Sequence, residues 1–455
     1  MPRDHHQQQN HHNGKADQED YDHDDKEEEE EEEEEEETTH TVFGSKTPFA
    51  EPKWYDSRNK SPYYTDDHRA FRNQIRKFVD EEIIPHVEDW ELKNAIPREI
   101  YVRAYEVGMI PAVIGWPEEV VGRKRPKGFD GYFAFICFDE LSRCASGGVV
   151  WGLVGGLGIG LPPVAHFGNE EIKKTIAGPC LRGEKRIALA VSEPTAGSDV
   201  ANLKTTAQED GDYYIVNGLK KWITCGLFAD YFTTAVRTGE EGSGMMGVSL
   251  LLIEKSRKGV SVRPMDCMGV KGSGTAYVEF DDVKVPKANL IGDVTILLRN
   301  FVTERLGLAV QANRFAREAL RLSIEHIRKR KVFGKTLEKQ PVVRYKIATM
   351  ARMVETTHAF LEALCYRIVV EEKDGGNWLE PLLRLGAEAA LAKVQATRTF
   401  EHCAREAAHL YGGNAYVKGN RVEHLYRQVL SLAIPGGSED VMVDAAARLS
   451  LKGKL

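Results

Sequence analysis

Hydrophobic residues between about residues 64 and 185 recur at spacings of three and four, the period of an amphipathic helix. The pattern is clearest where it begins, at Phe71, Ile75, Phe78, Val79 and Ile83. Pro85 then interrupts it, because proline removes a backbone donor and ends or kinks a helix. We therefore expect a helical N-terminal domain over residues 60–185.

Between about residues 186 and 292 the hydrophobic period changes to that of β-strands. Runs of β-branched and aromatic residues predict strands at Tyr213–Val216, Tyr231–Val236, Val248–Ile253 and Ala276–Phe280. Asp210-Gly211 and Asn217-Gly218 are residue pairs typical of tight hairpin turns. No helices alternate with these runs, so we expect a central antiparallel β-domain, a small barrel or sandwich, over residues 186–292.

Helical periodicity returns from residue 296 and continues to residue 455, in long stretches separated by breaking residues. The breaks fall at Pro341, Asp374-Gly375-Gly376, Gly412-Gly413 and Pro435-Gly436-Gly437. Four or five such helices make a bundle. The chain as a whole is therefore predicted to have a multidomain α+β fold, with a helical N-terminal domain, a central antiparallel β-domain and a C-terminal helical bundle.

Residues 1–45 have a different composition, with four early histidines and an unbroken glutamate run, Glu27–Glu37. The segment offers almost no apolar surface to offset the entropy lost on ordering, so we expect a disordered tail without a catalytic role. The first 40 residues hold 18 acidic and three basic side chains. Because the whole chain has a net charge of −8, the remainder carries +7, which suits anionic cofactors but makes a nucleic-acid groove unlikely.

Composition also bears on location and metal binding. The mean hydropathy is −0.40, and no run is expected to reach the roughly 20 apolar residues that cross a bilayer, so we expect no membrane partner. The seven cysteines are scattered without a C-x-x-C pair, which favours neither a metal site nor a disulfide framework. We expect an intracellular protein. A cytoplasmic location fits, a peroxisomal one is weakly suggested by the end Lys452–Leu455, and atypical mitochondrial import is a further alternative.

Two segments of the predicted β-domain can hold a polar aromatic ligand. Leu189–Val200 (LAVSEPTAGSDV) passes from a strand into a turn whose backbone N–H groups and hydroxyls, those of Ser192 and Ser198, can face a ligand. Further on, Trp222 and Thr224 share one strand face, which suits stacking on a ring while donating a hydrogen bond. An ordinary strand-to-loop exit and a core tryptophan explain these residues more simply when each segment is taken alone.

Together, however, SEPTAGSDV and KKWIT resemble the flavin-binding β-domain of the acyl-CoA dehydrogenases. The resemblance covers residues 60–455 and includes MGVKGSGTAYVEFDDVKVP, RKVFGK (Arg330–Lys335) and LYGGNAY (Leu410–Tyr416). It implies a helical domain, a β-domain and a four-helix bundle, with FAD held between the last two. The implied reaction is the α,β-dehydrogenation of an acyl-CoA thioester, as in fatty-acid β-oxidation.

The same resemblance implies roles for individual residues. Positions lining the isoalloxazine ring or making further flavin contacts are Val191, Ser192, Trp222, Thr224, Ser438 and Asp440. Positions reaching the FAD of a neighbouring subunit are Arg330, Phe333, Gly412 and Gly413, so a homotetramer or homodimer is expected. Ser198, Arg305 and Gly436 are expected to contact the acyl-CoA. One departure is His409, where many relatives carry glutamine.

The catalytic base is expected at Glu304. Many family members carry this glutamate near the C-terminus, but Gly436 occupies that position here. Isovaleryl-CoA and long-chain members carry it on an early helix of the C-terminal domain, immediately before an arginine, and Glu304-Arg305 matches that arrangement. The helical neighbours Phe301, Gly307 and Leu308 are apolar or small, so burial is expected to raise the pKa of Glu304. Glu439 is the weaker rival.

Two other activities are compatible with the same motifs. An acyl-CoA-oxidase-like enzyme would pass electrons to O2, whereas a dehydrogenase passes them to an electron-transferring flavoprotein. A flavin-retaining, DNA-associated binding protein with vestigial catalysis is the other alternative, suggested by the +7 body. The acyl group is expected to be branched or of medium to long chain, because helix-borne bases occur in those branches of the family.

Overall fold

The computed structural model describes residues 43–240, 242–373 and 379–451. The expected tail lies almost wholly outside the described residues, as do the Asp374-Gly375-Gly376 break and the Lys452–Leu455 end. All the described residues belong to one compact unit.

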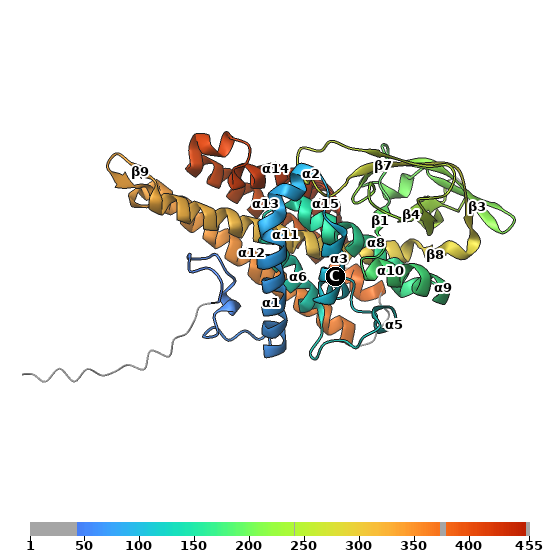
Figure 1. Cartoon of the computed structure of the whole chain (residues 1–455), viewed down its shortest axis with the longest axis horizontal. Coiled ribbons are helices and arrows are strands. Elements are labelled where there is room, and N and C mark those ends of the chain that lie inside the picture. The colour runs from blue at the N-terminus through green and yellow to red at the C-terminus, as the bar shows by residue number, and fades with distance from the viewer. Residues whose placement is uncertain (1–42, 241, 374–378, 452–455) are drawn as a thin grey trace, which may run out of the picture. The chain divides into compact units, whose positions relative to one another are not determined.

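The N-terminal domain is helical, as the 3.6-residue period predicts (Figure 1). π-helical turns at Val79–Ile83, Trp151–Gly155 and Lys173–Ala177 interrupt its helices, and Pro85 lies in a short 3-10 turn. The α-helices are α1 (Asp66–Phe78), α2 (Val87–Lys93), α3 (Arg98–Glu106), α4 (Met109–Val113), α5 (Glu118–Val121), α6 (Gly131–Ser142), α7 (Gly147–Val150), α8 (Gly156–Phe167), α9 (Glu170–Ile172) and α10 (Gly178–Leu181).

The helical stretch Gly147–Phe167 corrects one expectation. It has 21 residues and contains an 18-residue stretch with a mean hydropathy of 1.6, so the described part of the chain does contain one helical segment long and apolar enough to cross a bilayer. In the structure 72% of that stretch is buried inside the protein. Its C-terminal half, α8, packs against strand β1 (Ile187–Ala190), and the Thr233 hydroxyl donates a hydrogen bond to Gly160 O. The segment is therefore a core helix of the fold.

The β-domain is a single eight-stranded sheet with the order β6-β7-β3-β2-β4-β5-β8, and β1 pairs with β4 beside this path. Most pairs are antiparallel, as expected, but β1–β4 and the short β2–β4 contact are parallel. The remaining strands are β2 (Thr206–Asp210), β3 (Tyr213–Ile223), β4 (Tyr231–Arg237), β5 (Val248–Glu254), β6 (Val260–Pro264), β7 (Ala276–Pro286) and β8 (Leu290–Asp293).

One of the two predicted hairpin turns is wrong. Asp210-Gly211 does join β2 to β3, but Asn217-Gly218 lies inside β3, where the pairing with β7 shifts register. Gly218 has φ +155°, and a Cβ there would lie 2.3 Å from the Thr205 hydroxyl oxygen. Glycine is needed at this position because a second backbone segment approaches it, which is the signature of a bulge rather than a turn.

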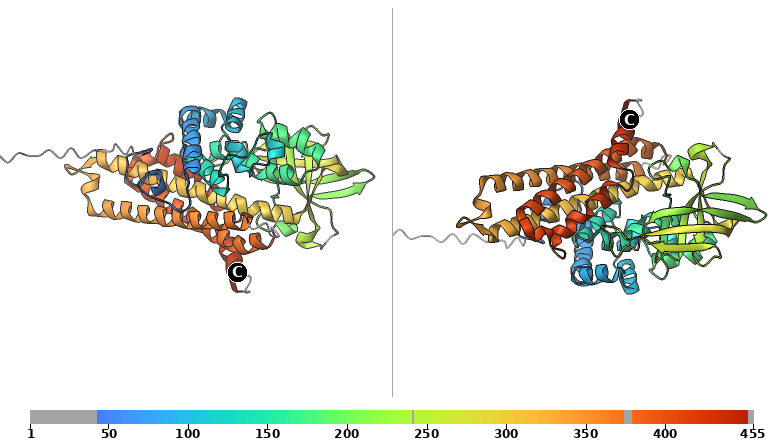
Figure 2. Two further views of the ribbon diagram at one scale, coloured as in Figure 1. Left: turned by 90° about the horizontal axis from the view of Figure 1, so that it is seen from below. Right: turned by 90° about the horizontal axis from the view of Figure 1, so that it is seen from above.

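The C-terminal part is a helical bundle centred on α13, which packs against each of the other four helices (Figure 2). The predicted breaks at Pro341, Gly412 and Pro435–Gly437 all separate helices in the structure. A small hairpin, β9 (Lys331–Val332) and β10 (Lys335–Thr336), joins the first two helices. The helices are α11 (Val294–Lys329), α12 (Pro341–Lys373), α13 (Leu379–Tyr411), α14 (Arg421–Ala433) and α15 (Glu439–Leu451).

The segment before α1 contributes to the core, although no domain was predicted there. Trp54 and Tyr55 are buried, and the Tyr55 hydroxyl donates hydrogen bonds to Glu140 and to Asp139 Oδ2, the latter at 3.1 Å. Glu51 accepts hydrogen bonds from Arg76 at 3.0 Å and from Arg314 of α11 at 3.2 Å. These contacts tie the segment to α1, α6 and α11 at once.

Candidate active site

Glu304 lies near the N-terminal end of α11 and is only partly accessible to solvent. Gly307 and Leu308, which share its helix face, are buried, and Phe301 is partly buried, as the spacing predicts. Burial raises the pKa of Glu304 from 4.5 to about 7, against the opposing effect of the positive charges on Arg305 and Lys393. A carboxylate with a pKa near neutrality suits a general base, because about half of it is ionised at pH 7 and the ionised form binds a proton well.

Arg305 and Lys393 bind the loop between α14 and α15. The Arg305 Nε donates a hydrogen bond to Gly436 O at 2.9 Å. From α13, the Lys393 Nζ donates to Ala433 O at 2.5 Å and to Gly437 O at 3.0 Å. Arg305 was expected to contact the acyl-CoA, and its Nε engages this loop. The two cations thus hold three carbonyl groups of one short segment.

The same loop needs its glycines. Gly436 and Gly437 have φ values of +68° and +100°, a region that residues with a side chain rarely adopt. A Cβ on Gly437 would lie 2.2 Å from the Met442 methyl carbon, and one on Gly436 would lie 3.0 Å from a Leu308 methyl. Contact with Leu308 places Gly436 against the same turn of α11 that carries Glu304.

The rival Glu439 is engaged elsewhere. It begins α15, and its carboxylate accepts a 2.5 Å hydrogen bond from the Thr397 hydroxyl and forms a 3.2 Å ion pair with Arg398. Ser438 precedes this helix, and its carbonyl accepts a hydrogen bond from the Met442 N–H. A base held by two partners of this kind is poorly placed for proton abstraction, so the geometry favours Glu304.

In the β-domain, a buried ion pair joins the two motif segments. Lys220 Nζ lies 2.8 Å from Glu193 Oε1 and also donates to Val191 O at 3.0 Å, while the Lys221 N–H donates to Ser192 O at 2.9 Å. Burial lowers the pKa of Lys220 to about 8 although Glu193 opposes the shift. Val191 and Ser192 are therefore held against β3, which carries Trp222. Thr224 was expected on the same strand face as Trp222, but β3 ends at Ile223 and Trp222 has a left-handed φ, so Thr224 lies in the turn that follows the strand.

The residues present fit a flavin. Trp222 has φ +60° and leaves 48% of its surface exposed, which is unusual for so large an apolar side chain unless something stacks on it. The neighbouring Ser192 and Thr224 are partly exposed and carry hydroxyls that can donate to ring nitrogen and oxygen atoms. Ser198 lies in the exposed turn beyond them. This combination provides an aromatic platform edged by hydrogen-bond donors.

A chain of contacts joins this platform to the helix of Glu304. Cys225, next to Thr224, has its Sγ 3.5 Å from Trp151 O, and the Trp151 indole donates to Gln311 Oε1 at 3.1 Å. Gln311 lies on α11 two turns beyond Glu304, on the same face. The β-domain motif and the candidate base thus border one region between the sheet and the bundle.

Four predicted flavin residues lie elsewhere, at the opposite end of α11 (Figure 1). Arg330 ends that helix, 26 residues after Glu304, or about 39 Å away at 1.5 Å per residue. Phe333 is 97% exposed, and a Cβ on Gly412 or Gly413 would meet nothing within 4 Å. These residues cannot contact a ring beside Glu304 of their own chain.

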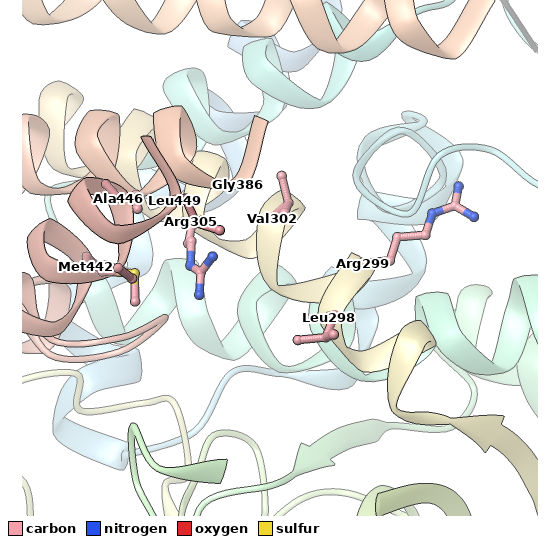
Figure 3. A pocket seen from close by; sticks show the side chains of 10 residues that line it. Leu298, Arg299, Val302, Arg305, Gly386, Met442, Ala446 and Leu449 are labelled. Atoms are coloured by element: carbon pink, nitrogen blue, oxygen red, sulfur yellow. The ribbon is translucent and has the colours of Figure 1, made fainter. Parts of the chain in front are cut away.

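An apolar cavity of about 120 Å³ lies between α11, α13 and α15 (Figure 3). Val302 and Leu298 line it from the helix face turned away from Glu304. Arg305 borders the cavity on one side and the Gly436 loop on the other. The cavity therefore lies behind the candidate base.

Most of the described chain, from residue 65 onward, matches three family models in order. The acyl-CoA dehydrogenase N-terminal domain covers residues 65–184, the middle domain residues 188–283 and the C-terminal domain residues 294–451. The chain belongs to the acyl-CoA dehydrogenase family.

Known relatives can be aligned with this acyl-CoA dehydrogenase over most of its length. It is 37% identical to the acyl-CoA dehydrogenase apdG of Emericella nidulans, over 90% of this chain and 96% of that one. It is 31% identical to the mitochondrial long-chain specific acyl-CoA dehydrogenase of Sus scrofa, over 85% and 86%. The crystal structure of a probable acyl-CoA dehydrogenase from Mycobacterium abscessus covers 85% of this chain with a TM-score of 0.77 and 37% identity, and 99% of it is matched.

Membership confirms the fold and the class of chemistry expected from the motifs. Acyl-CoA dehydrogenases are FAD-dependent oxidoreductases that act on acyl-CoA thioesters. Sequence reasoning missed Lys393 and the Glu193–Lys220 pair. The second could have been suspected, since Glu193 and Lys220 lie inside the two motifs, whereas nothing near Lys393 in the sequence marks it.

Proposed function

We propose that this acyl-CoA dehydrogenase removes the α-proton of a branched or medium- to long-chain acyl-CoA with Glu304 as the base. The observation that carries the proposal is the position of Glu304, a partly buried carboxylate on the part of α11 whose Arg305 and Leu308 contact the Gly436 loop, and burial there raises its pKa. Glu304 takes the proton, and the C–H electron pair becomes the Cα–Cβ double bond as a hydride leaves the β-carbon. When bound, FAD supplies the acceptor for that hydride.

The other residues orient the reactants. The Gly436 N–H donates a hydrogen bond to the thioester carbonyl oxygen, on which negative charge develops as the α-proton leaves. Trp222, Ser192 and Thr224 would hold the isoalloxazine ring of FAD, the indole by stacking and the two hydroxyls by hydrogen bonds. Val191 belongs to the same wall. Ser198, in the exposed turn, holds the CoA portion, while Asp440 makes a further flavin contact from the first turn of α15.

A second subunit completes the cofactor site. The distance along α11 supports the proposal that Arg330, Phe333, Gly412 and Gly413 serve the flavin of a neighbouring subunit, and an exposed phenylalanine is stabilised by burial against a partner. The proposed subunit contact can be tested without replacing Phe333. Sedimentation of the FAD-loaded protein should show a dimer or tetramer, and a monomer that retains FAD would contradict it.

The class of acyl group is inferred only from the position of the proposed base in the sequence. Helix-borne bases are the arrangement of the isovaleryl-CoA and long-chain members that this chain resembles, and one relative is named a long-chain enzyme. We therefore propose a branched or longer acyl chain. The electron acceptor is an electron-transferring flavoprotein, and a stoichiometric yield of hydrogen peroxide per turnover in air would instead identify an oxidase.

The test follows the flavin absorbance anaerobically while short, branched and long acyl-CoA thioesters are added. Bleaching by one class identifies both the reaction and the substrate. Glu304→Gln is expected to slow bleaching by about 10² to 10⁴, the usual contribution of a general base, whereas Glu439→Gln should bleach at close to the parent rate. Bleaching of the Glu304→Gln protein at the parent rate would remove Glu304 from the mechanism.

A further inference from the structure

Lys393 is a lysine with no solvent-accessible surface in the middle of α13. Lysine is almost never fully buried unless its charge is paired. Among the described residues no carboxylate lies within 4 Å of its ammonium group, and its partners are the carbonyl oxygens of Ala433 and Gly437. A buried cation that relies on two peptide carbonyls is costly to keep, so the position calls for a specific explanation.

The two carbonyls that Lys393 binds bracket the loop of the active site. Ala433 is the last residue of α14, and Gly437 lies just before α15. Between them lies Gly436, whose carbonyl accepts a hydrogen bond from Arg305 at 2.9 Å. With Arg305, Lys393 therefore holds the backbone of residues 433–437 by three carbonyls, in a conformation with two left-handed glycines.

The positive charge of Lys393 also affects the protonation of Glu304. Its positive charge favours the ionised form of Glu304, as does that of Arg305 on the same helix. Burial lowers the pKa of Lys393 to about 8, with Glu439 of α15 as the main opposing charge, so the ammonium group is largely protonated at pH 7. Glu304, Arg305, Lys393 and Glu439 thus form one coupled set of charges from α11, α13 and α15.

We propose that Lys393 is a positioning residue of the active site, whose ammonium group holds the loop that presents the Gly436 N–H and supplies a positive charge beside Glu304. The proposal deepens the proposed function and rests on it for its kinetic part. A purely structural lysine that caps α14 would stabilise the protein without any effect on the pH at which the base titrates. The two roles are therefore separable.

The first experiment replaces the charge with a side chain of similar length, Lys393→Met, in the FAD-loaded protein. The rate of flavin reduction is expected to fall about tenfold or more, because small displacements of a reacting group are costly, with a smaller change in the KM for acyl-CoA. The midpoint of the acidic limb of the pH–rate profile should rise, since a charge that favours ionised Glu304 is lost. Lys393→Arg, which keeps the charge, should restore the midpoint.

The second readout needs no turnover. Hydrogen exchange of the backbone amides in residues 433–438 should be faster in Lys393→Met than in the parent. The matched control is Arg398→Met, which removes a neighbouring cation of α13 that pairs with Glu439 but does not touch the loop. This variant should keep the parent rate, midpoint and exchange.

Parent-like values of the pH midpoint and of loop exchange in Lys393→Met would overturn the proposal. If that variant does not retain FAD, Lys393→Gln, which keeps one donor for the loop without the charge, is measured in its place by the same criteria. A parent protein that no acyl-CoA bleaches would refute the proposed function, and the exchange comparison would still decide whether Lys393 holds the loop.

Discussion

Helix α11 takes part in two buried clusters of charged residues, and the pKa of a carboxyl group is shifted in opposite directions in the two. At Glu304, burial outweighs the nearby cations and raises the pKa of the carboxyl to about 7. Ten residues further along the same helix, Arg314 pairs with Asp139 and with Glu51 of the segment before α1. Burial alone would raise the pKa of Asp139 as well, but Arg314 and its hydrogen bonds bring that pKa down to about 2.

The difference lies in how directly each carboxylate is paired. Asp139 accepts two hydrogen bonds from the Arg314 guanidinium, one at 2.9 Å, and so keeps its charge. Glu304 influences Arg305 and Lys393 through space, while the hydrogen bonds of those cations go to loop carbonyls. Because Arg305 and Lys393 donate their hydrogen bonds to backbone carbonyls, the Glu304 carboxylate can exchange a proton near pH 7. The Arg314 cluster keeps its carboxylates charged, and the Glu304 cluster holds the pKa of the proposed base near neutrality.

The largest expected effect comes from removing the cation of the structural cluster. Arg314→Met leaves the carboxylates of Asp139 and Glu51 buried without their main partner, which should cost about 3 to 5 kcal/mol of stability. Thermal unfolding of the FAD-loaded protein measures it. Tyr55→Phe, which removes only hydroxyl hydrogen bonds of the same cluster, should cost about 1 kcal/mol. Equal losses in the two variants would show that the cluster is not held by charge pairing.

Much of this contrast was beyond sequence reasoning, for a physical reason. Glu304 could be proposed because the Glu304-Arg305 pair that carries the family resemblance is local in the chain, and its apolar helix neighbours added support. The partners of Arg314 and Lys393 are brought together only by the fold, with Glu51 on an irregular segment and Ala433 on another helix. Hydrophobic periods predicted the helices and strands well, because those periods reflect local geometry.

The Asn217-Gly218 pair shows that local sequence alone does not identify a hairpin turn. Asn217-Gly218 has the composition of a hairpin turn, yet the close approach of Thr205 makes it a bulge inside a strand. Glycine serves both situations, since each requires either a positive φ or the absence of a Cβ. Only the tertiary neighbour distinguishes them. The same limit hid the role of Lys220, whose partner Glu193 lies in the other motif.

A third buried pair sharpens the comparison, because Lys220 is hydrogen-bonded to Glu193 as Arg314 is to Asp139 but lies beside the proposed cofactor site. Lys220→Met should loosen the Val191–Ser192 segment and weaken FAD retention about tenfold, with a smaller loss of stability than in Arg314→Met. Dialysis followed by flavin absorbance gives the affinity. Lys258→Met, which removes an exposed lysine of the same β-domain, should retain FAD like the parent, and full retention by both variants would refute the role of the pair.

The smallest expected effect concerns the free energy of unfolding, which should depend on pH in opposite directions through Glu304 and through the carboxylates of the Arg314 cluster. Glu304 keeps its proton in the folded protein up to about pH 7 but loses it near pH 4.5 when unfolded, so its ionisation lowers stability as pH rises between these values. Glu304→Gln should therefore be more stable than the parent at pH 8, by about 1 to 2 kcal/mol after allowing for partial exposure, and by less at pH 5. Glu51 and Asp139, with pKa values of about 2, contribute stability above about pH 4 that is lost only as pH falls toward 2. Unfolding midpoints of the two proteins at both pH values measure the first effect. A stability gain that grows toward low pH would mean that Glu304 is paired like Asp139, and the contrast along α11 would disappear.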